Sequence, residues 1–202
     1  MRMAVQSACY LLIQRAKCVI LFMLRRGTRH AKGRRMKLFI KQKVFSWGDK
    51  FHVYDENQND LLYVEGEVFT FGKKLHVYDA GGNELAFVHQ KVWSFLPRYF
   101  ISRNGVDIAE VVKQFTFFRQ EYSVNGPGWT VDGDFWAHEY EITSDGRSVA
   151  SISKRWFTWG DTYEIDIADG ADVVLALCVV LIIDAVLQQQ SNNSATTMHN
   201  NN

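Results

Sequence analysis

The sequence contains few cysteines, which crosslink small secreted domains, and few prolines, which interrupt β-strands. Three cysteines occur among 202 residues, and only Cys178 lies beyond the first 35. This usage excludes a disulfide framework in the main part of the chain and fits a reducing compartment. Two prolines leave room for long uninterrupted strands. No clean apolar run approaches the roughly 18 residues of an ordinary membrane-spanning helix.

Motifs for catalysis and metal binding are also missing. The chain contains no CxxC pair, no HExxH, no GxSxG, no phosphate-binding Gly-Lys-Ser/Thr loop and no dinucleotide-binding fingerprint. We therefore expect a protein that is not an enzyme and that carries no metal or other cofactor.

Acidic residues are absent from the first 35 positions, which hold nine lysines and arginines. From Met36 onward the chain has 14 basic and 22 acidic residues, a net charge of −8, which argues against nucleic acid as a partner. Because the composition changes so sharply, we expect Met36 to be the true start and residues 1–35 to be a mis-assigned or disordered leader. A secretory signal and a basic membrane-surface helix are the alternatives, although Arg15 and Lys17 interrupt the apolar segment 8–24.

Aromatic residues are abundant, at 14% of the chain, and they recur in an internal repeat. The segment that begins KVFSWGDKFHVYD at Lys43 returns as EVFTFGKKLHVYD at Glu67. Related segments begin at Lys91, Lys113 and Arg155. Such self-similarity is typical of a fold built from repeated units.

Each repeat alternates apolar and polar residues and is punctuated by turn residues such as Gly48-Asp49 and Asn104-Gly105. This period of two predicts half-buried strands, with His52 and His76 on the outer face. The predicted strands are 38–47, 50–55, 61–71, 74–79, 85–95, 98–103, 107–117, 120–124, 128–132, 135–142, 148–159 and 161–167. By the same alternation, we expect ten aromatic side chains of the long strands to be buried: Phe45, Trp47, Phe69, Phe71, Trp93, Phe95, Phe115, Phe117, Phe157 and Trp159.

Twelve strands with short connections should pair antiparallel and close into a barrel, because closure removes exposed edges. Such a barrel is too wide for its own side chains to fill. Residues 171–187 supply a plug, since Val173–Ile183 is apolar on every side. Asp172 offers an N-cap, which favours a helix, and a buried strand is the alternative.

A motif near the middle of the chain resembles the signature of the LURP-one-related family. It consists of GPGWTVDGDF from Gly126, followed by EYEI from Glu139. The resemblance covers residues 36 to about 188 and implies a closed barrel of about twelve strands around a central apolar C-terminal helix. It also implies a relation to tubby C-terminal domains and phospholipid scramblases, and hence phospholipid contact and membrane-linked signalling. The basic head-group ligands of tubby proteins have no matching motif here.

Five basic residues in or beside turns are candidates for binding an anionic lipid head group. They are Lys73, Lys74, Arg98, Arg103 and Arg119. The alternative is that they are scattered solvated charges.

Other reactive side chains have structural explanations. Cys178 lies in an apolar run, where burial makes a thiol inert. We expect Asp184 to lie at the barrel mouth, bonded to backbone or water. Asp132, Asp134 and Glu139 fit loop chemistry better than an acid–base pair.

We therefore expect a mainly β protein with a closed barrel at 36–188 and a disordered polar tail at 189–202. Its expected role is non-enzymatic binding of an anionic phospholipid or a protein partner at the membrane surface, in the cytoplasm. A protein-interaction module without a ligand and a scramblase-like lipid translocator are the alternatives.

Overall fold

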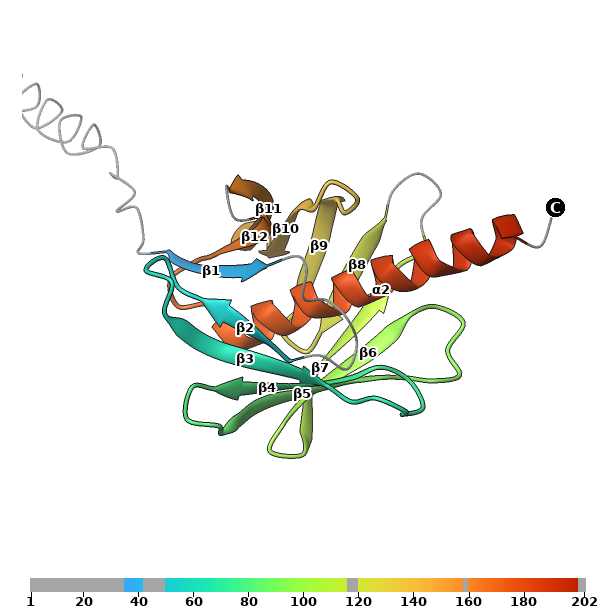
Figure 1. The fold of residues 1–202 in the computed structure, drawn as a ribbon, viewed down its shortest axis with the longest axis horizontal. Helices are drawn as coiled ribbons and strands as arrows, with labels where there is room; N and C mark the ends of the chain where they lie inside the picture. The colour runs from blue at the N-terminus through green and yellow to red at the C-terminus, as the bar shows by residue number, and fades with distance from the viewer. Residues whose placement is uncertain (1–34, 42–49, 116–119, 158–159, 200–202) are drawn as a thin grey trace, which may run out of the picture. The chain divides into compact units, whose positions relative to one another are not determined.

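The alternating segments form antiparallel strands in the computed structural model of the chain (Figure 1). The structure describes residues 35–41, 50–115, 120–157 and 160–199. Within these ranges each strand pairs with the strand before it, and the first pairs with the last, so the sheet closes. The predicted barrel of twelve strands is thus confirmed. The strands are β1 (Met36–Lys41), β2 (Lys50–Tyr54), β3 (Asp60–Gly66), β4 (Lys74–Asp79), β5 (Glu84–Gln90), β6 (Arg98–Arg103), β7 (Val106–Lys113), β8 (Glu121–Asn125), β9 (Trp129–Asp134), β10 (Glu139–Ser144), β11 (Arg147–Phe157) and β12 (Gly160–Ile167).

Side-chain alternation decides which face of each strand is inside. In β2, Phe51 and Val53 are buried while His52 between them faces outward. In β4, Leu75 and Val77 are buried in the same way. The inner faces of the strands therefore supply one continuous apolar lining.

The helix α2 (Val173–His199) fills the barrel. Every side chain from Leu175 to Leu187 is buried, as a helix apolar on all sides requires. Asp172 caps the helix, since its Oδ1 accepts a hydrogen bond from the backbone N–H of Leu175 at 3.0 Å. The same carboxylate receives two hydrogen bonds from Arg103, which ties the start of α2 to the end of β6.

One stretch among the described residues, Val173–Ser191, is long and apolar enough to cross a membrane by length and composition alone. In this structure 72% of it is buried inside the protein. The segment predicted as a plug is therefore a helix rather than a strand. It continues beyond the predicted end at Leu187 as far as His199, into the tail for which we expected disorder.

The burial of the long-strand aromatic residues was predicted incorrectly. Strands β3, β5 and β7 end at Gly66, Gln90 and Lys113, before the aromatic residues that were assigned to them. Phe69, Phe71, Trp93, Phe95 and Phe115 are exposed as a result. Phe45, Trp47, Phe117 and Trp159, and the side chain of Phe157, lie outside the described part of the structure.

The early strand ends have a local cause. A backbone hydrogen bond joins the first residue of each aromatic loop to the residue seven positions on: Glu67 to Lys74, Lys91 to Arg98 and Gln114 to Glu121. Beyond these bonds the chain leaves the sheet, and the alternating aromatic side chains of the described loops reach solvent. The barrel interior is already filled by α2.

Candidate functional site

The two ends of the barrel differ in composition. Because consecutive strands run in opposite directions, every second connection lies at the same end. The connections 55–59, 80–83, 104–105, 126–128, 145–146 and 168–172 share one end and contain no aromatic residue. We call this the polar end. The opposite end carries 67–73, 91–97, 114–115 and 135–138, and we call it the aromatic end.

The aromatic end exposes most of the large apolar side chains that reach solvent in the described structure. Phe69, Phe71, Trp93 and Phe95 are between 84 and 104% exposed. Phe115, Trp136 and Val68 are exposed at the same end, whereas Phe135 turns inward and is buried. Met36 and Val106, by contrast, lie beside the polar end. Soluble proteins rarely expose large apolar residues together unless the surface binds something.

The loops at 67–73 and 91–97 present their rings in a defined way. Each has two aromatic residues separated by one polar residue, Thr70 or Ser94, so that both loops have the same pattern. Phe69 has a φ of 59°, a left-handed conformation that is strained for an aromatic residue. The hydroxyl of Thr70 donates a hydrogen bond to the carbonyl oxygen of Gly72 at 3.0 Å, which stabilises the turn.

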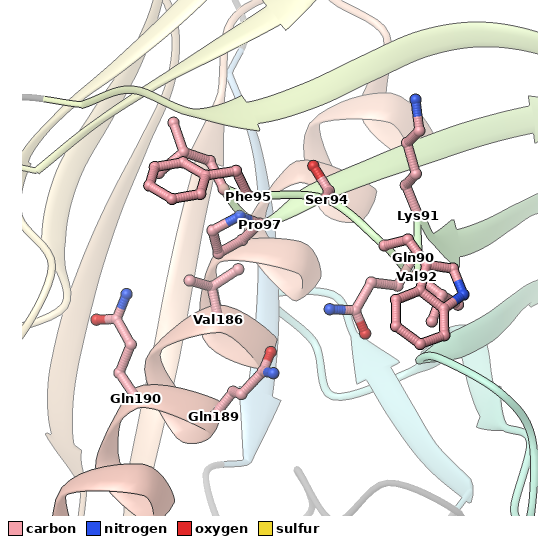
Figure 2. Close-up of a pocket in the computed structure, with 11 residues that line it drawn as sticks. Gln90, Lys91, Val92, Ser94, Phe95, Pro97, Val186, Gln189 and Gln190 are labelled. Atoms are coloured by element: carbon pink, nitrogen blue, oxygen red, sulfur yellow. The ribbon is translucent and has the colours of Figure 1, made fainter.

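The helix reaches the aromatic end beside these loops. In Figure 1, α2 leaves the barrel on the side where the β3–β4 and β5–β6 loops lie. A cavity of about 450 Å³ lies between the 91–97 loop and the residues Val186, Gln189 and Gln190 of α2 (Figure 2). A second cavity, of about 390 Å³, lies under the 67–73 loop, and Gln90 lines both.

Basic residues accompany the exposed rings. The segments 67–74 and 91–98 carry four bases and one acid, although the chain from Met36 onward has a net charge of −8. Burial lowers the pKa of Lys73 and of Lys113. Lys113 is at the end of β7, two residues after the buried Val111, and so lies on the same side of the strand. The two segments 67–74 and 91–98 together therefore carry a net charge of +3.

The structure brings together three of the five predicted head-group candidates. Lys73, Lys74 and Arg98 lie at the aromatic end. Lys74 pairs with Glu67 at 3.0 Å, and Arg98 pairs with Glu110 at 2.5 Å. Arg103 lies at the polar end, held by Asp172, and Arg119 lies outside the described residues.

The exposed rings were not recognised from the sequence as part of a surface site. Their alternation with polar residues continues that of the preceding strands, so they were predicted to lie inside the barrel. One signal was available. All aromatic-rich connections alternate with polar ones along the chain, and in an antiparallel meander that order places them at one end.

Two histidines of the described strands lie on the outer face of the barrel. No group of three or more potential metal ligands occurs among the residues that the structure describes. His52 and His76 face outward, as predicted. His76 bridges Glu67 at 2.9 Å and Glu84 at 2.7 Å, so it anchors the base of the 67–73 loop.

The buried reactive groups are explained by packing. Complete burial raises the pKa of Cys178 to about 12, which makes the thiol inert. Asp184 is only 7% exposed, and burial raises its pKa to about 7. Its Oδ2 accepts a hydrogen bond from the side-chain amide of Gln188 at 2.7 Å. Asp134 accepts a hydrogen bond from the N–H of Ala137, a loop role.

Known proteins share this sequence pattern and fold. The sequence model of the LURP-one-related family matches residues 36–184. A protein of Bacillus subtilis strain 168, the uncharacterised YxjI, is 39% identical over 153 residues, which cover 75% of this chain and 94% of that protein. A solved structure of an Arabidopsis thaliana protein has a TM-score of 0.56 at 17% identity, covering 75% of this chain and 91% of that one, and so shares the fold. The barrel and most of its buried helix fall within the family match, and the chain belongs to the LURP-one-related family.

Proposed function

We propose that this protein is a non-enzymatic, membrane-peripheral phospholipid-binding module that docks on anionic membrane surfaces through its aromatic end, in the cytoplasm. The observation that carries the proposal is that the aromatic-rich loops and the polar turns lie at opposite ends of the barrel. Fully exposed rings from separate loops gather at one end of the barrel, and the other end has polar turns.

The membrane–water interface suits such rings. Phenylalanine and tryptophan partition into the boundary between head groups and acyl chains, where ring and backbone polarity are both accommodated. Burying one such side chain contributes about 1.5–3 kcal/mol as an upper value. Insertion of Phe69, Phe71, Trp93 and Phe95 would therefore offset the cost of association.

Charge favours the same orientation. Lys73, Lys74, Lys91 and Arg98 flank the rings, and a base near an anionic surface contributes about 1 kcal/mol. Lys74 and Arg98 contribute less than this, because they already pair with Glu67 and Glu110. The acidic remainder of the protein would be repelled by the same surface. Attraction at one end and repulsion elsewhere favour a single docking orientation.

Liposome co-sedimentation tests the proposal. Phe69→Ala/Phe71→Ala and Trp93→Ala/Phe95→Ala should each weaken binding to anionic vesicles by about tenfold or more, since tenfold corresponds to about 1.4 kcal/mol. Val106→Ala is the matched control, because Val106 is exposed at the polar end. Equal loss in the control, or no binding of the unmodified protein, would contradict the proposal.

A scramblase-like translocator is the second candidate, because Val173–Ser191 is long and apolar enough to cross a membrane. It would require α2 to leave the barrel. A lipid-flip assay with reconstituted protein separates the two candidates, since peripheral docking predicts no flipping. Failure of both assays would favour a protein-interaction module.

A further inference from the structure

The cavity between α2 and the 91–97 loop has a mixed lining that selects among ligands. Its walls combine the amides of Gln90, Gln189 and Gln190 with Ser94 and with apolar residues such as Val186. Lys91 is the one basic residue that lines it, and none of the described lining residues is acidic. Neighbouring Trp93 and Phe95 are the exposed rings of the proposed membrane contact.

We propose that this cavity binds the head group of an anionic phospholipid that carries one phosphodiester and free hydroxyl groups, as in phosphatidylglycerol. The inference rests on the proposed function and adds a lipid preference to it. The volume of about 450 Å³ is within the range of small-ligand sites, so a head group fits while the acyl chains stay in the bilayer beside Trp93 and Phe95.

The amides account for recognition of hydroxyl groups. A glutamine side chain both donates and accepts hydrogen bonds, as a hydroxyl group does, so three amides around one cavity match a polyol. The side-chain amide oxygen Oε1 of Gln90 accepts a hydrogen bond from the backbone N–H of Lys73 at 3.1 Å, which fixes this amide in place. Gln189 and Gln190 project from a helix that is anchored in the barrel (Figure 2).

The charges account for the choice of a single phosphate. In Figure 2 the amino group of Lys91 points away from Val186, Gln189 and Gln190, so a phosphodiester paired with it would lie on the side of the cavity opposite the helix amides. Within the lining of this cavity, one lysine matches one phosphodiester, and a second phosphate group would meet no further basic lining residue. A choline or ethanolamine head group finds no carboxylate in the cavity lining, and its buried cation would be unpaired.

Vesicle binding at matched surface charge tests the preference. Phosphatidylglycerol and phosphatidylserine each add one negative charge, so vesicles with equal mole fractions of either lipid in phosphatidylcholine differ only in the head group. We expect about fivefold or tighter binding to phosphatidylglycerol, as one or two additional hydrogen bonds would provide. Gln189→Leu/Gln190→Leu should abolish this ratio and retain binding to both vesicles, while Ser191→Leu, on the same helix outside the cavity, should preserve it.

A soluble probe separates the head group from the bilayer. Glycerophosphoglycerol should shift the NMR signals of the Gln189 and Gln190 side-chain amides, and inorganic phosphate should not. Vesicle binding without a preference between the two lipids would overturn this inference and leave the proposed function standing. Equal shifts with inorganic phosphate would also overturn it, because recognition would then involve phosphate alone. Absence of vesicle binding altogether would overturn both.

Discussion

At the residue scale, glycine in the GPGWTVDGDF motif has a steric explanation. Gly133 has a φ of 141°, and a Cβ there would lie 2.6 Å from the carbonyl oxygen of Glu139 and from the Cα of Tyr140. Strands β9 and β10 therefore approach each other at a point that only glycine allows. This part of the family signature reflects the barrel rather than a ligand site.

Substitution of this glycine should destabilise the barrel. Gly133→Ala should lower the free energy of unfolding by about 2 kcal/mol or more, because backbone atoms must move. Urea denaturation followed by tryptophan fluorescence measures the change. Gly105→Ala is the control, since Gly105 also has a positive φ but no atom within 4 Å of the added Cβ. A cost at Gly133 no larger than at Gly105 would refute the steric explanation.

Asp184 makes stability depend on pH. Burial raises its pKa from 3.8 to about 7, and Tyr140 lies close enough to interact with it electrostatically. The folded protein therefore holds this proton at pH values where the unfolded chain has released it. Stability must then fall as pH rises from about 4 to about 7, and the loss persists above that range.

Asp184→Asn should remove this dependence. The variant should gain about 2–4 kcal/mol relative to the unmodified protein between pH 4 and pH 8, at about 1.36 kcal/mol per pKa unit. Comparison of the two proteins cancels the titration of histidines that both contain. Thermal or urea unfolding across that pH range measures the difference, with Asp145→Asn in an exposed turn as the control. Parallel profiles for the Asp184 variant and the unmodified protein would rule out the buried carboxyl as the cause.

At the scale of elements, α2 is the component that completes the core. Its residues from Leu175 to Leu187 fill a lumen that the strands cannot fill themselves. The helix is the last element in the chain, so the core cannot be complete until it packs. This burial accounts for the apolar character of the helix in the folded barrel.

Shortening a central side chain of α2 should be costly. Ile182→Ala removes a side chain that is 1% exposed and should cost about 2–5 kcal/mol, the range for buried aliphatic residues. Gln189→Ala, on the exposed part of the same helix, should change stability by no more than about 0.5 kcal/mol. Chemical denaturation provides both values. Similar small effects at both positions would indicate that the helix is loosely packed.

At the scale of the whole molecule, the contrast between the two ends of the barrel predicts a docking direction for the proposed membrane binding. The rings and their flanking bases lie at the aromatic end, and the Arg103–Asp172 pair lies at the polar end. If the aromatic end binds the membrane and the rest of the protein is acidic, the barrel should dock with its aromatic end facing the bilayer. The exit of α2 at the aromatic end would place Gln189 and Gln190 near the lipid surface.

Environment-sensitive labels should report this direction. Cys178 is buried and unreactive, so replacement of Cys9 and Cys18 by serine leaves a background for single labelling. A fluorophore on Thr70→Cys, between Phe69 and Phe71, should shift to the blue when anionic vesicles are added. The same label on Val106→Cys at the polar end should not respond. A response at both positions, or only at Val106, would exclude end-on docking.

The number and pairing of the strands, the outward position of His52 and His76 and the burial of the C-terminal apolar segment could all be predicted from the sequence. Period-two alternation and an all-apolar segment are local properties, and each permits one kind of burial. The exposure of Phe69, Phe71, Trp93 and Phe95 depends instead on how the folded barrel closes. Their alternation continues that of the preceding strand, so no local signal marks where pairing stops. Closure of the barrel around α2 filled the interior, and the hydrogen bonds at the loop bases left these rings outside it.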